Sequence, residues 1–318
     1  MWQVYLLRDR GRAEDDFNEA RATIWRVWDG REPMHPKELA ALAIVAQRVT
    51  VAAGAAILRW YAAADPGATE KADASPLTRA DTEAHDIILA GLSDATPVIP
   101  VLSEEGHHAP AEERRHWRRC WIVDPLDGTR EFLARNDQFT VNVALVEDGR
   151  PLLGVVGVPA QDMLYLGVVP ESRAERVQLS EGRREAIRVR RFPNAEAPVV
   201  LASRSHRGPE LETLMRALSE RFPGLEERQV GSALKLVELA CGRADGYPRR
   251  GPCSEWDIAA GEAVLLAAGG RICRRDGGEL RYNKPDSLLN PDFWAVCDPE
   301  GPLADAFREL FAGSGAER

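Results

Sequence analysis

The sequence predicts an α/β protein whose N-terminal half is of the α+β type. Between residues 97 and 168, short apolar or alternating stretches follow one another with turns between them, which is typical of antiparallel strands. After residue 199, predicted strands alternate with predicted helices. The pattern changes near residues 185–197, so we expect one unit over residues 34–190 and a second over residues 191–318.

The first unit begins with a predicted amphipathic helix. Apolar residues recur at helical spacing over residues 36–61, and a second helix is predicted at about residues 80–92. The strands predicted after these helices cover residues 97–102, 121–123, 139–147, 152–158 and 163–168. The polar stretch 170–194 contains no predicted element.

In the second unit strands and helices alternate, as in a layered sheet structure. The predicted strands are residues 199–202, 229–230, 244–247, 271–273 and 293–296. The predicted helices are residues 210–221, 233–242, 256–268 and 302–311.

Residues 1–33 differ from the rest of the chain. Residues 2–7 suit a strand, the following residues are highly charged, and no later segment pairs with them in an obvious way. Met34 precedes a good helix start. Either Met34 is the true initiator or the segment is a genuine N-terminal extension, and both interpretations stay open.

The composition excludes several classes of protein. The hydrophobic content of 44% supports a sizeable core, no apolar run approaches the roughly 20 residues that cross a bilayer, and the charged N-terminus is unlike a signal peptide. The five scattered cysteines suit buried thiols in a reducing cytoplasm better than disulfides or zinc ligands. The net charge of −9 argues against a nucleic-acid partner and permits a small anionic one. We expect a cytoplasmic protein without an integral membrane segment, a monomer or a homodimer, with peripheral contact to the inner membrane left open.

Two aspartates stand at the end of the apolar run at residues 121–123. Asp124 and Asp127 are followed directly by Gly128 and Thr129. Carboxylates this close repel each other unless a cation lies between them, and ligation by oxygen alone favours a hard metal such as Mg²⁺. The backbone N–H groups and the hydroxyl of Gly128-Thr129 suit a phosphate oxygen. In isolation, however, Asp-Pro and Asp-Gly pairs are typical of turns.

Three further acidic sites lie at the edges of predicted elements. Asp81 precedes a helix, Glu104 and Glu105 follow a strand, and Asp257 stands at a helix start. Taken singly, the aspartates suit helix N-termini and the glutamates a solvated loop.

The order of these sites resembles the inositol monophosphatase superfamily, whose members are Mg²⁺-dependent, lithium-sensitive phosphatases. The resemblance rests on the pair Glu104-Glu105, on Asp-Pro-Leu-Asp-Gly-Thr at residues 124–129 and on Trp-Asp-Ile-Ala-Ala-Gly at residues 256–261, and it extends over about residues 36–300. It implies a layered α-β-α-β-α sandwich, with a metal-binding unit over residues 34–190 and a substrate-recognition unit over residues 191–318.

Within this superfamily the chain is similar to the 3'(2'),5'-bisphosphate nucleotidases. The segments that carry this likeness are residues 71–81, 100–105, 127–132, 139–145, 203–206, 231–235, 244–249 and 288–291. The departures are residues 1–33 and small changes such as Gly246 and Cys253, which we expect to touch no metal ligand.

The resemblance implies a role for each residue of the motifs. Two or three Mg²⁺ ions would be held by Glu104, Asp124, Asp127, Asp257 and the carbonyl of Leu126. Two such ions can clamp the attacking water and the leaving oxygen. Thr129 and Asp81 would orient and deprotonate the water, because a hydroxyl alone is too weak a base. Glu105 would act behind the ligands, and the amides of Gly128 and Thr129 would hold the phosphate.

Substrate choice is expected to come from the second unit. Lys235 and Arg249 would bind a second phosphate. Ser203, His206, Ser232 and Asp257 would complete the substrate contacts. By default, Lys235 would be a solvated helix residue and His206 a loop residue.

The expected reaction is hydrolysis of the 3'-phosphate of adenosine 3',5'-bisphosphate, with its 5'-phosphosulfate relative as a further substrate. An inositol or sugar phosphatase with the same metal centre is the alternative. A remote alternative is an inactive nucleotide-binding regulator, which would be expected to lack one of the ligands.

Overall fold

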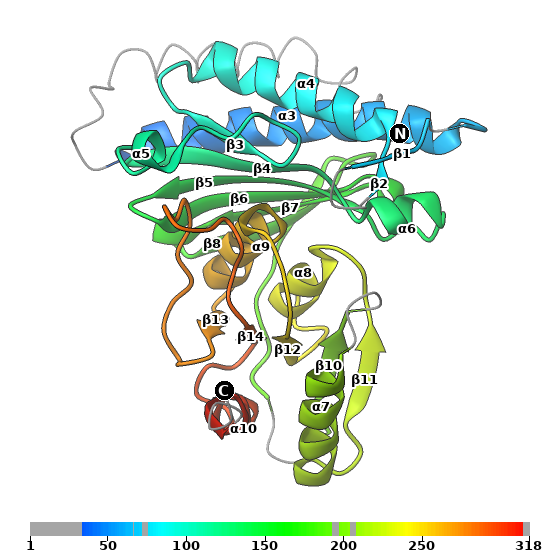
Figure 1. The fold of residues 1–318 in the computed structure, drawn as a ribbon, viewed down its shortest axis with the longest axis vertical. Coiled ribbons are helices and arrows are strands. Elements are labelled where there is room, and N and C mark those ends of the chain that lie inside the picture. The colour runs from blue at the N-terminus through cyan, green and yellow to red at the C-terminus, as the bar shows by residue number, and fades with distance from the viewer. Residues whose placement is uncertain (1–33, 66, 72–75, 193–196, 204–207, 314–318) are drawn as a thin grey trace.

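The computed structural model describes residues 34–65, 67–71, 76–192, 197–203 and 208–313. Its elements form five layers, which Figure 1 shows from top to bottom. Helices α3 (Pro36–Ala62) and α4 (Arg79–Ala95) cover one face of a seven-stranded sheet, and α8 (Leu234–Ala240) and α9 (Glu255–Ala267) lie below it. A five-stranded sheet and two outer helices, α7 (Pro209–Arg221) and α10 (Pro302–Gly313), complete the layers. The predicted α-β-α-β-α sandwich is confirmed.

The seven-stranded sheet follows the chain order. Its strands are β3 (Val101–Ser103), β4 (Arg119–Asp127), β5 (Thr140–Glu147), β6 (Arg150–Val158), β7 (Met163–Val168), β8 (Arg173–Gln178) and β9 (Arg183–Ala186). Every neighbouring pair is antiparallel except β3 and β4, which are parallel. The parallel pair places the carboxyl ends of β3 and β4 at the same edge of the sheet, and there the chain carries its acidic residues.

Strands β8 and β9 lie in the stretch 170–194, where the sequence predicted no element. Their side chains are mostly charged and only partly buried, so neither strand has the apolar alternation of an inner strand. Arg176 on β8 pairs with Glu185 on β9 at 2.5 Å. Charged residues are common on strands at a sheet edge, where they discourage pairing with another chain. The sequence analysis therefore missed both strands, because their polar side chains lack the apolar pattern by which strands are recognised.

Strand β4 is longer than the predicted strand at residues 121–123. It continues through Asp124, which pairs with Asn142 of β5, and ends at Asp127 after an irregularity in the register. A bulge of this kind re-aims side chains relative to the sheet. Asp124 and Asp127 are thus part of a buried strand rather than of a turn after it.

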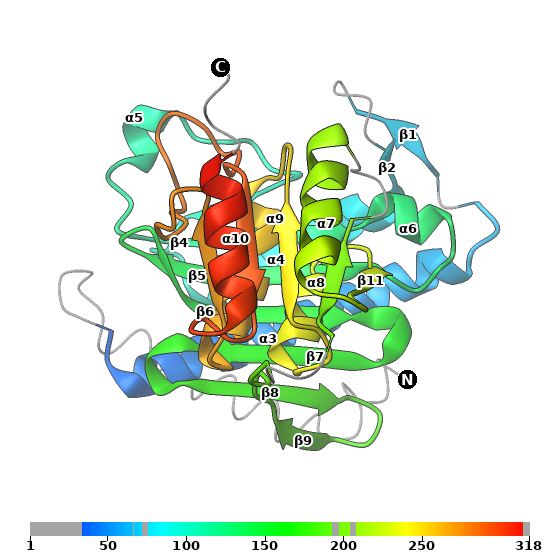
Figure 2. The ribbon, with the colours of Figure 1, turned by 90° about the horizontal axis from the view of Figure 1, so that it is seen from below.

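The five-stranded sheet has the order β11-β10-β12-β14-β13. These strands are β10 (Val199–Ala202), β11 (Glu226–Gln229), β12 (Gly246–Arg249), β13 (Arg271–Arg274) and β14 (Phe293–Val296). Strands β11 and β12 each lie a few residues from their predicted positions. Figure 2 shows α7 and α10 side by side on the outer face of this sheet, where Arg221 and Glu309 form an ion pair between them.

Several short elements were not predicted. They are β1 (Thr69–Glu70), β2 (Pro76–Leu77), α5 (Ala111–Arg114), α6 (Thr129–Leu133) and two 3₁₀ turns, η1 (Pro159–Gln161) and η2 (Val169–Glu171). Of these, α6 matters most for function, since it begins at Thr129, two residues after the second aspartate.

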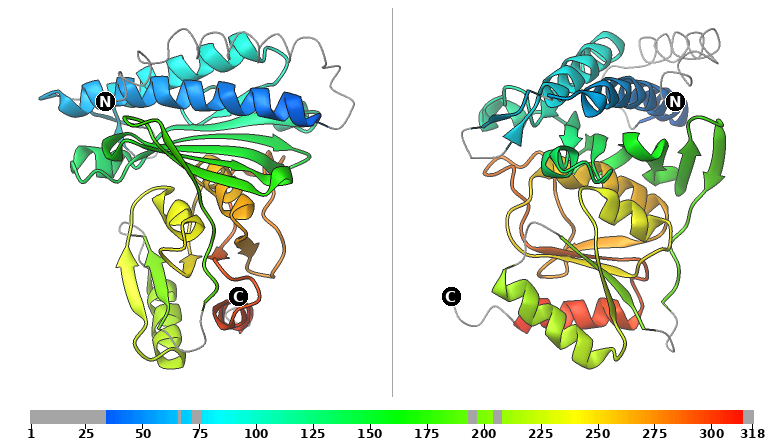
Figure 3. Two further views of the ribbon diagram at one scale, coloured as in Figure 1. Left: turned by 180° about the vertical axis from the view of Figure 1, so that it is seen from behind. Right: turned by 90° about the vertical axis from the view of Figure 1, so that its right-hand side faces the viewer.

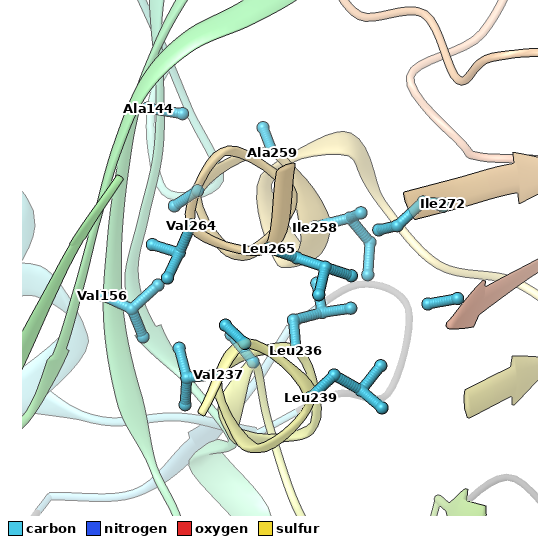
Figure 4. Packing of buried hydrophobic residues seen from close by; sticks show 14 of the residues in the cluster. Ala144, Val156, Leu236, Val237, Leu239, Ile258, Ala259, Val264, Leu265 and Ile272 are labelled. Carbon is cyan, nitrogen blue, oxygen red and sulfur yellow. The ribbon is translucent and has the colours of Figure 1, made fainter. Parts of the chain in front are cut away.

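Helix α9 is buried between the two sheets. A Cβ at Gly154 of β6 would lie 2.2 Å from the carbonyl oxygen of Ala260, so only glycine allows the helix backbone to approach this closely. Figure 4 shows Val264 and Leu265 of α9 packed among Val156 of the first sheet and residues of α8. This packing fixes the helix whose first turn carries Asp257.

Helix α3 is long and apolar enough to cross a membrane, which the search for unbroken apolar runs did not reveal. In its most apolar window, 72% of the residues are buried inside the fold, and the helix runs along the first sheet (Figure 3). Leu42, Val45 and Ile57 have no exposed surface. The helix is therefore a core helix of this fold.

The predicted division near residue 190 stays a prediction. The strands of the two sheets fall on either side of that point, yet α8 and α9 from the second half share a hydrophobic core with strands of the first sheet. The strand predicted at residues 2–7 and the question of Met34 as initiator concern residues 1–33, which lie outside the described residues.

Candidate active site

Three carboxylates meet at the carboxyl ends of β3 and β4. Glu104 follows β3 directly, Asp124 lies in β4, and Asp257 is in the first turn of α9. One oxygen from each lies within 4.8 Å of the others. The fold thus brings together residues that are as much as 153 positions apart in the chain (257 − 104).

Burial and mutual repulsion raise the pKa values of the aspartates in and beside this cluster. Burial, followed by the charge of Glu104, raises the pKa of Asp124 well above its usual range. Burial, and then the charge of Asp257, raises the pKa of Asp127 to about 7. Burial and Glu104 raise the pKa of Asp257 to about 6. Crowded oxygens that repel one another suit a hard divalent cation, so these residues fit such a metal.

The carboxylate of Asp127 accepts hydrogen bonds from both halves of the chain. Its Oδ2 accepts hydrogen bonds from the backbone N–H of Ala233, at 2.6 Å, and from Nδ2 of Asn142, at 3.3 Å. The carbonyl oxygen of Leu126 lies 3.4 Å from Oγ1 of Thr129. All five predicted ligands line the same cavity. Glu104, Asp124 and Asp257 form the carboxylate cluster, and Asp127 and Leu126 stand beside it.

Lys71 supplies a positive charge that the sequence analysis had used only as part of a motif. Its Nζ lies 2.7 Å from Oε1 of Glu104 and 2.5 Å from Oε1 of Glu105. The presence of a lysine among conspicuously acidic motifs was the signal that could have identified this contact. Glu105, predicted to act behind the metal ligands, is thus bound to the same ammonium group as Glu104.

Asp81 and Thr129 form the predicted pair. The Thr129 hydroxyl donates to Oδ1 of Asp81 at 3.2 Å. Oδ2 of Asp81 accepts from the N–H and the hydroxyl of Thr78, at 2.7 and 2.6 Å, which forms the capping box of α4. Asp81 is therefore both a helix-capping residue and the partner of Thr129, so the two interpretations of this residue do not exclude each other.

The turn between β4 and α6 requires glycine. Gly128 has φ +91°, a left-handed conformation that side chains rarely adopt, and it begins α6. A Cβ at this position would also lie 3.2 Å from the carbonyl oxygen of Gln138. The backbone of Gly128 and Thr129 consequently faces the cavity without an intervening side chain.

A cavity of about 250 Å³ connects the acidic cluster with the second half of the chain. Its walls include most of the predicted site residues, namely Glu104, Asp124, Leu126, Asp127, Gly128, Thr129, Ser203, Ser232, Lys235, Arg249 and Asp257. Asp81 and Glu105 lie behind this wall, in contact with Thr129 and Lys71. His206 lies outside the described residues.

Lys235 is not the solvated helix residue that it would be by default. It is buried, and its Nζ donates to the carbonyl oxygens of Ser232, at 2.7 Å, and Val230, at 3.3 Å. Burial lowers the pKa of this lysine to about 8, against the opposing effect of Asp127. Arg249 is buried beside it and donates through Nη2 to the carbonyl of Pro252. Two buried cations, Lys235 and Arg249, therefore lie in the cavity wall, which Arg130 also lines.

Cys253 and Gly246 are departures from the family pattern with different consequences. The Cys253 thiol lies 3.4 Å from Oδ2 of Asp257, so the expectation that this departure touches no metal ligand is wrong. Gly246 is remote from the cluster, and a Cβ there would lie 2.7 Å from the ring of Phe307 on α10.

Comparison with known proteins agrees with this geometry. The model of the inositol monophosphatase family matches residues 38–300, and the chain belongs to this family. Within it, the chain is 46% identical to the 3'(2'),5'-bisphosphate nucleotidase CysQ of Salmonella typhimurium over 243 residues, which are 76% of this chain and 94% of that protein. It is 44% identical over the same length and shares to the protein of that name from Escherichia coli K12.

A solved structure shows the same fold. The crystal structure of CysQ from Bacteroides thetaiotaomicron, a bacterial member of the inositol monophosphatase family, superposes with a TM-score of 0.70 at 40% identity. The match covers 82% of this chain and 98% of that one. The resemblance inferred from the motifs is confirmed for both the family and the fold.

Proposed function

We propose that this protein is a cytoplasmic, Mg²⁺-dependent 3'(2'),5'-bisphosphate nucleotidase that hydrolyses adenosine 3',5'-bisphosphate to AMP and phosphate. The observation that carries the proposal is a single cavity with a carboxylate cluster on one side and the buried cations Lys235 and Arg249 on the other. A substrate with two phosphate groups can place one of them at the carboxylate cluster and the other at the buried cations. The names of the relatives from Salmonella and Escherichia coli support the same substrate class.

The residues that would hold the metal all offer hard oxygen donors. They are Glu104, Asp124, Asp127, Asp257 and the carbonyl of Leu126, for two or three Mg²⁺ ions. When bound, these ions would supply Lewis acidity and neutralise charge at the phosphoryl group.

The proton of the attacking water is handled by Thr129 and Asp81. The Thr129 hydroxyl already donates its hydrogen to Asp81, so its lone pairs are free to accept a hydrogen from water. As the water attacks phosphorus, the bond between phosphorus and the 3'-oxygen breaks. The water proton passes to Oγ1 of Thr129 while the threonine proton passes to Oδ1 of Asp81, and the leaving 3'-oxygen takes a proton from solvent water. Oδ2 of Asp81 is held by Thr78, which fixes the direction of the carboxylate during this transfer.

The remaining residues bind and orient the substrate. The backbone amides of Gly128 and Thr129 would hold the scissile phosphate, and Lys235 with Arg249 would hold the second one. Ser203, Ser232 and Asp257 line the same cavity and are proposed to contact the ribose, the base or the phosphate. The role predicted for His206 stays a prediction.

We extend the proposal to the 5'-phosphosulfate relative of the substrate. Lys235 and Arg249 both carry positive charge in the cavity wall, and a phosphosulfate is an anion with acceptor oxygens like those of a phosphate, so it can occupy the same side of the cavity. This activity would release adenosine 5'-phosphosulfate and phosphate.

The test is a phosphate-release panel with adenosine 3',5'-bisphosphate, inositol 1-phosphate and fructose 1,6-bisphosphate, each with Mg²⁺ and with a chelator. We expect kcat/KM to be highest for the nucleotide and activity to vanish with the chelator. Equal or better turnover of inositol 1-phosphate would support the alternative inositol or sugar phosphatase and contradict our proposal. An absence of turnover on every compound would leave the inactive regulator, although its expected loss of a ligand is not seen here.

A further inference from the structure

Glu131 is an acidic residue in the cavity wall to which the reaction above assigns no role. It lies in the first turn of α6, two residues after Thr129, and is partly buried. Its side chain lines the cavity. In the part of the chain that the structure describes, its carboxylate makes no hydrogen bond or ion pair. Because this partly buried carboxylate faces the cavity without a protein partner among the described residues, it is available to a ligand.

Two glycines leave the space that Glu131 occupies. A Cβ at Gly231 would lie 2.8 Å from Cγ of Glu131, closer than real atoms approach. A Cβ at Gly128 would lie 3.3 Å from Oε2 of Glu131. Gly128 directly precedes α6, Gly231 lies three residues before α8, and both glycines line the cavity. The Glu131 side chain is thus held between the proposed phosphate-binding turn and the loop that carries Ser232.

The chemistry of the cavity limits what Glu131 can bind. An ionised carboxylate only accepts hydrogen bonds, so it does not suit a phosphate oxygen of the substrate. Its oxygens lie outside the described three-carboxylate cluster. Unlike Asp127, whose pKa the charge of Asp257 raises, Glu131 is not among the main charges that act on Asp124, Asp127 or Asp257, so we place it outside the metal site. A neutral donor remains, and a sugar hydroxyl is such a donor.

The position of Glu131 indicates which hydroxyl. Its Oε2 lies against Gly128, whose backbone would hold the phosphate that is removed. A group bound there must therefore be close to the phosphorylated carbon. In adenosine 3',5'-bisphosphate the hydroxyl on the adjacent carbon is the ribose 2'-OH, whereas the amino group of the base lies on the far side of the sugar.

We propose that Glu131 accepts a hydrogen bond from the hydroxyl adjacent to the scissile phosphate and thereby selects ribonucleotides over 2'-deoxyribonucleotides. This inference rests on the proposed function, because it takes the bisphosphate nucleotide as the substrate. A site built to bind a hydroxyl rejects the analogue that lacks it, since the partly buried acceptor is then left without its partner.

The experiment compares kcat/KM for adenosine 3',5'-bisphosphate and its 2'-deoxy analogue in the wild type, Glu131→Ala and Glu131→Gln. We expect the wild type to prefer the ribonucleotide by about 10- to 100-fold, the range of a hydrogen bond to a charged group. In Glu131→Ala this ratio should fall to near one, mainly through the ribonucleotide. Glu131→Gln keeps an acceptor of the same shape and should lose only part of the preference.

Glu212→Ala is the matched control, because Glu212 is exposed on α7 and far from the cavity wall. It should leave the ratio unchanged. A wild type that turns over both nucleotides equally, or a ratio unaffected by Glu131→Ala, would overturn the inference and leave the proposed function intact. An equal loss on both nucleotides, together with weaker Mg²⁺ binding by calorimetry, would show a metal-binding role and also overturn it. If the wild type hydrolyses neither nucleotide, the proposed function fails and the inference fails with it.

Discussion

The hydroxyl of Thr129 donates a hydrogen bond to Oδ1 of Asp81 at 3.2 Å, which joins the start of α6 to the first turn of α4. The two residues are 48 positions apart, and Asp81 is almost completely buried. An isolated threonine hydroxyl is a poor base, so the buried carboxylate gives this hydroxyl its proposed function.

Asp81→Asn should remove the proton acceptor while keeping a side chain that can bond to Thr78 and Thr129. We expect kcat to fall by about 100- to 10,000-fold, the usual contribution of general-base catalysis, with KM little changed. Steady-state kinetics measures this, and calorimetry should show that Mg²⁺ still binds. The control is Asp86→Asn, an exposed position on the same helix, which should retain wild-type kcat. A kcat for Asp81→Asn within twofold of the wild type would rule out this role.

Asp124→Asn should change stability and metal binding in opposite directions. The buried cluster of Glu104, Asp124 and Asp257 is destabilised by repulsion when no cation is present. Removing one charge should therefore raise the Tm of the chelated protein at pH 8 by a few degrees, roughly the effect of 1 kcal/mol in a chain of this size. Added Mg²⁺ should raise the Tm of the wild type but not of the variant. Scanning calorimetry with EDTA and with Mg²⁺ measures both effects. Equal stabilisation of both proteins by Mg²⁺ would show that Asp124 is not a ligand.

Lys284 and Glu255 hold the start of the helix that carries Asp257. The Glu255 side chain is fully buried, and its Oε1 lies 2.5 Å from Nζ of Lys284, which is 24% exposed. Lys284→Met should leave a buried carboxylate without its cation, at a cost of about 2 to 4 kcal/mol in the free energy of unfolding. Urea denaturation measures this cost. The double variant with Glu255→Gln should recover a large part of it, because the unpaired charge is then gone. A double variant no more stable than Lys284→Met would show that the pairing is not what matters.

Glu262 should make stability fall as the pH rises. Burial raises the pKa of this carboxyl to about 8, and the Tyr282 hydroxyl donates a hydrogen bond to it. In the unfolded chain glutamate titrates at about 4.3, so between that pH and 8 the folded protein retains a proton that the unfolded chain has released. The contribution of Glu262 is complete below the unfolded pKa and is lost as the pH rises to the folded one.

Glu262→Gln should remove this dependence. Between pH 5 and pH 8, the wild type should lose about 2 to 4 kcal/mol more of its free energy of unfolding than the variant does. Urea denaturation at both pH values, in the presence of EDTA, measures the difference. Glu220→Gln, at an exposed position on α7, should behave as the wild type does. Parallel pH profiles for the wild type and Glu262→Gln would contradict the assignment.

The elements with a clear hydrophobic period could be predicted from the sequence. Helix α3 and strands β5, β6 and β7 lie within a few residues of their predicted positions, because burial imposes a regular apolar pattern on them. Strands β8 and β9 could not be found in this way, since charged pairs at the sheet edge replace the apolar pattern.

The site residues likewise divide into those that the sequence predicts and those that only the structure reveals. The acidic residues could be found because they follow apolar strands or begin a helix and because their flanking residues are unusual. Contacts between side chains that are distant in the chain could not be placed from the sequence, although Lys71 stood out as a lysine among acidic motifs. The ammonium of Lys71 meets Glu104 only in the folded chain, and the packing of Glu131 depends on Gly231, a hundred positions away (231 − 131). Such contacts arise from the tertiary fold, and neither the hydrophobic periodicity nor a local motif reveals them.

The identity of the phosphate that leaves tests our central claim most directly. Phosphorus NMR of the products formed from adenosine 3',5'-bisphosphate by the wild type, with Mg²⁺, distinguishes the two possible monophosphates. We expect inorganic phosphate and adenosine 5'-phosphate in equal amounts, and no product when EDTA replaces Mg²⁺. Adenosine 3'-phosphate as the product, or unchanged turnover in EDTA, would contradict the proposal that the carboxylate cluster acts on the 3'-phosphate.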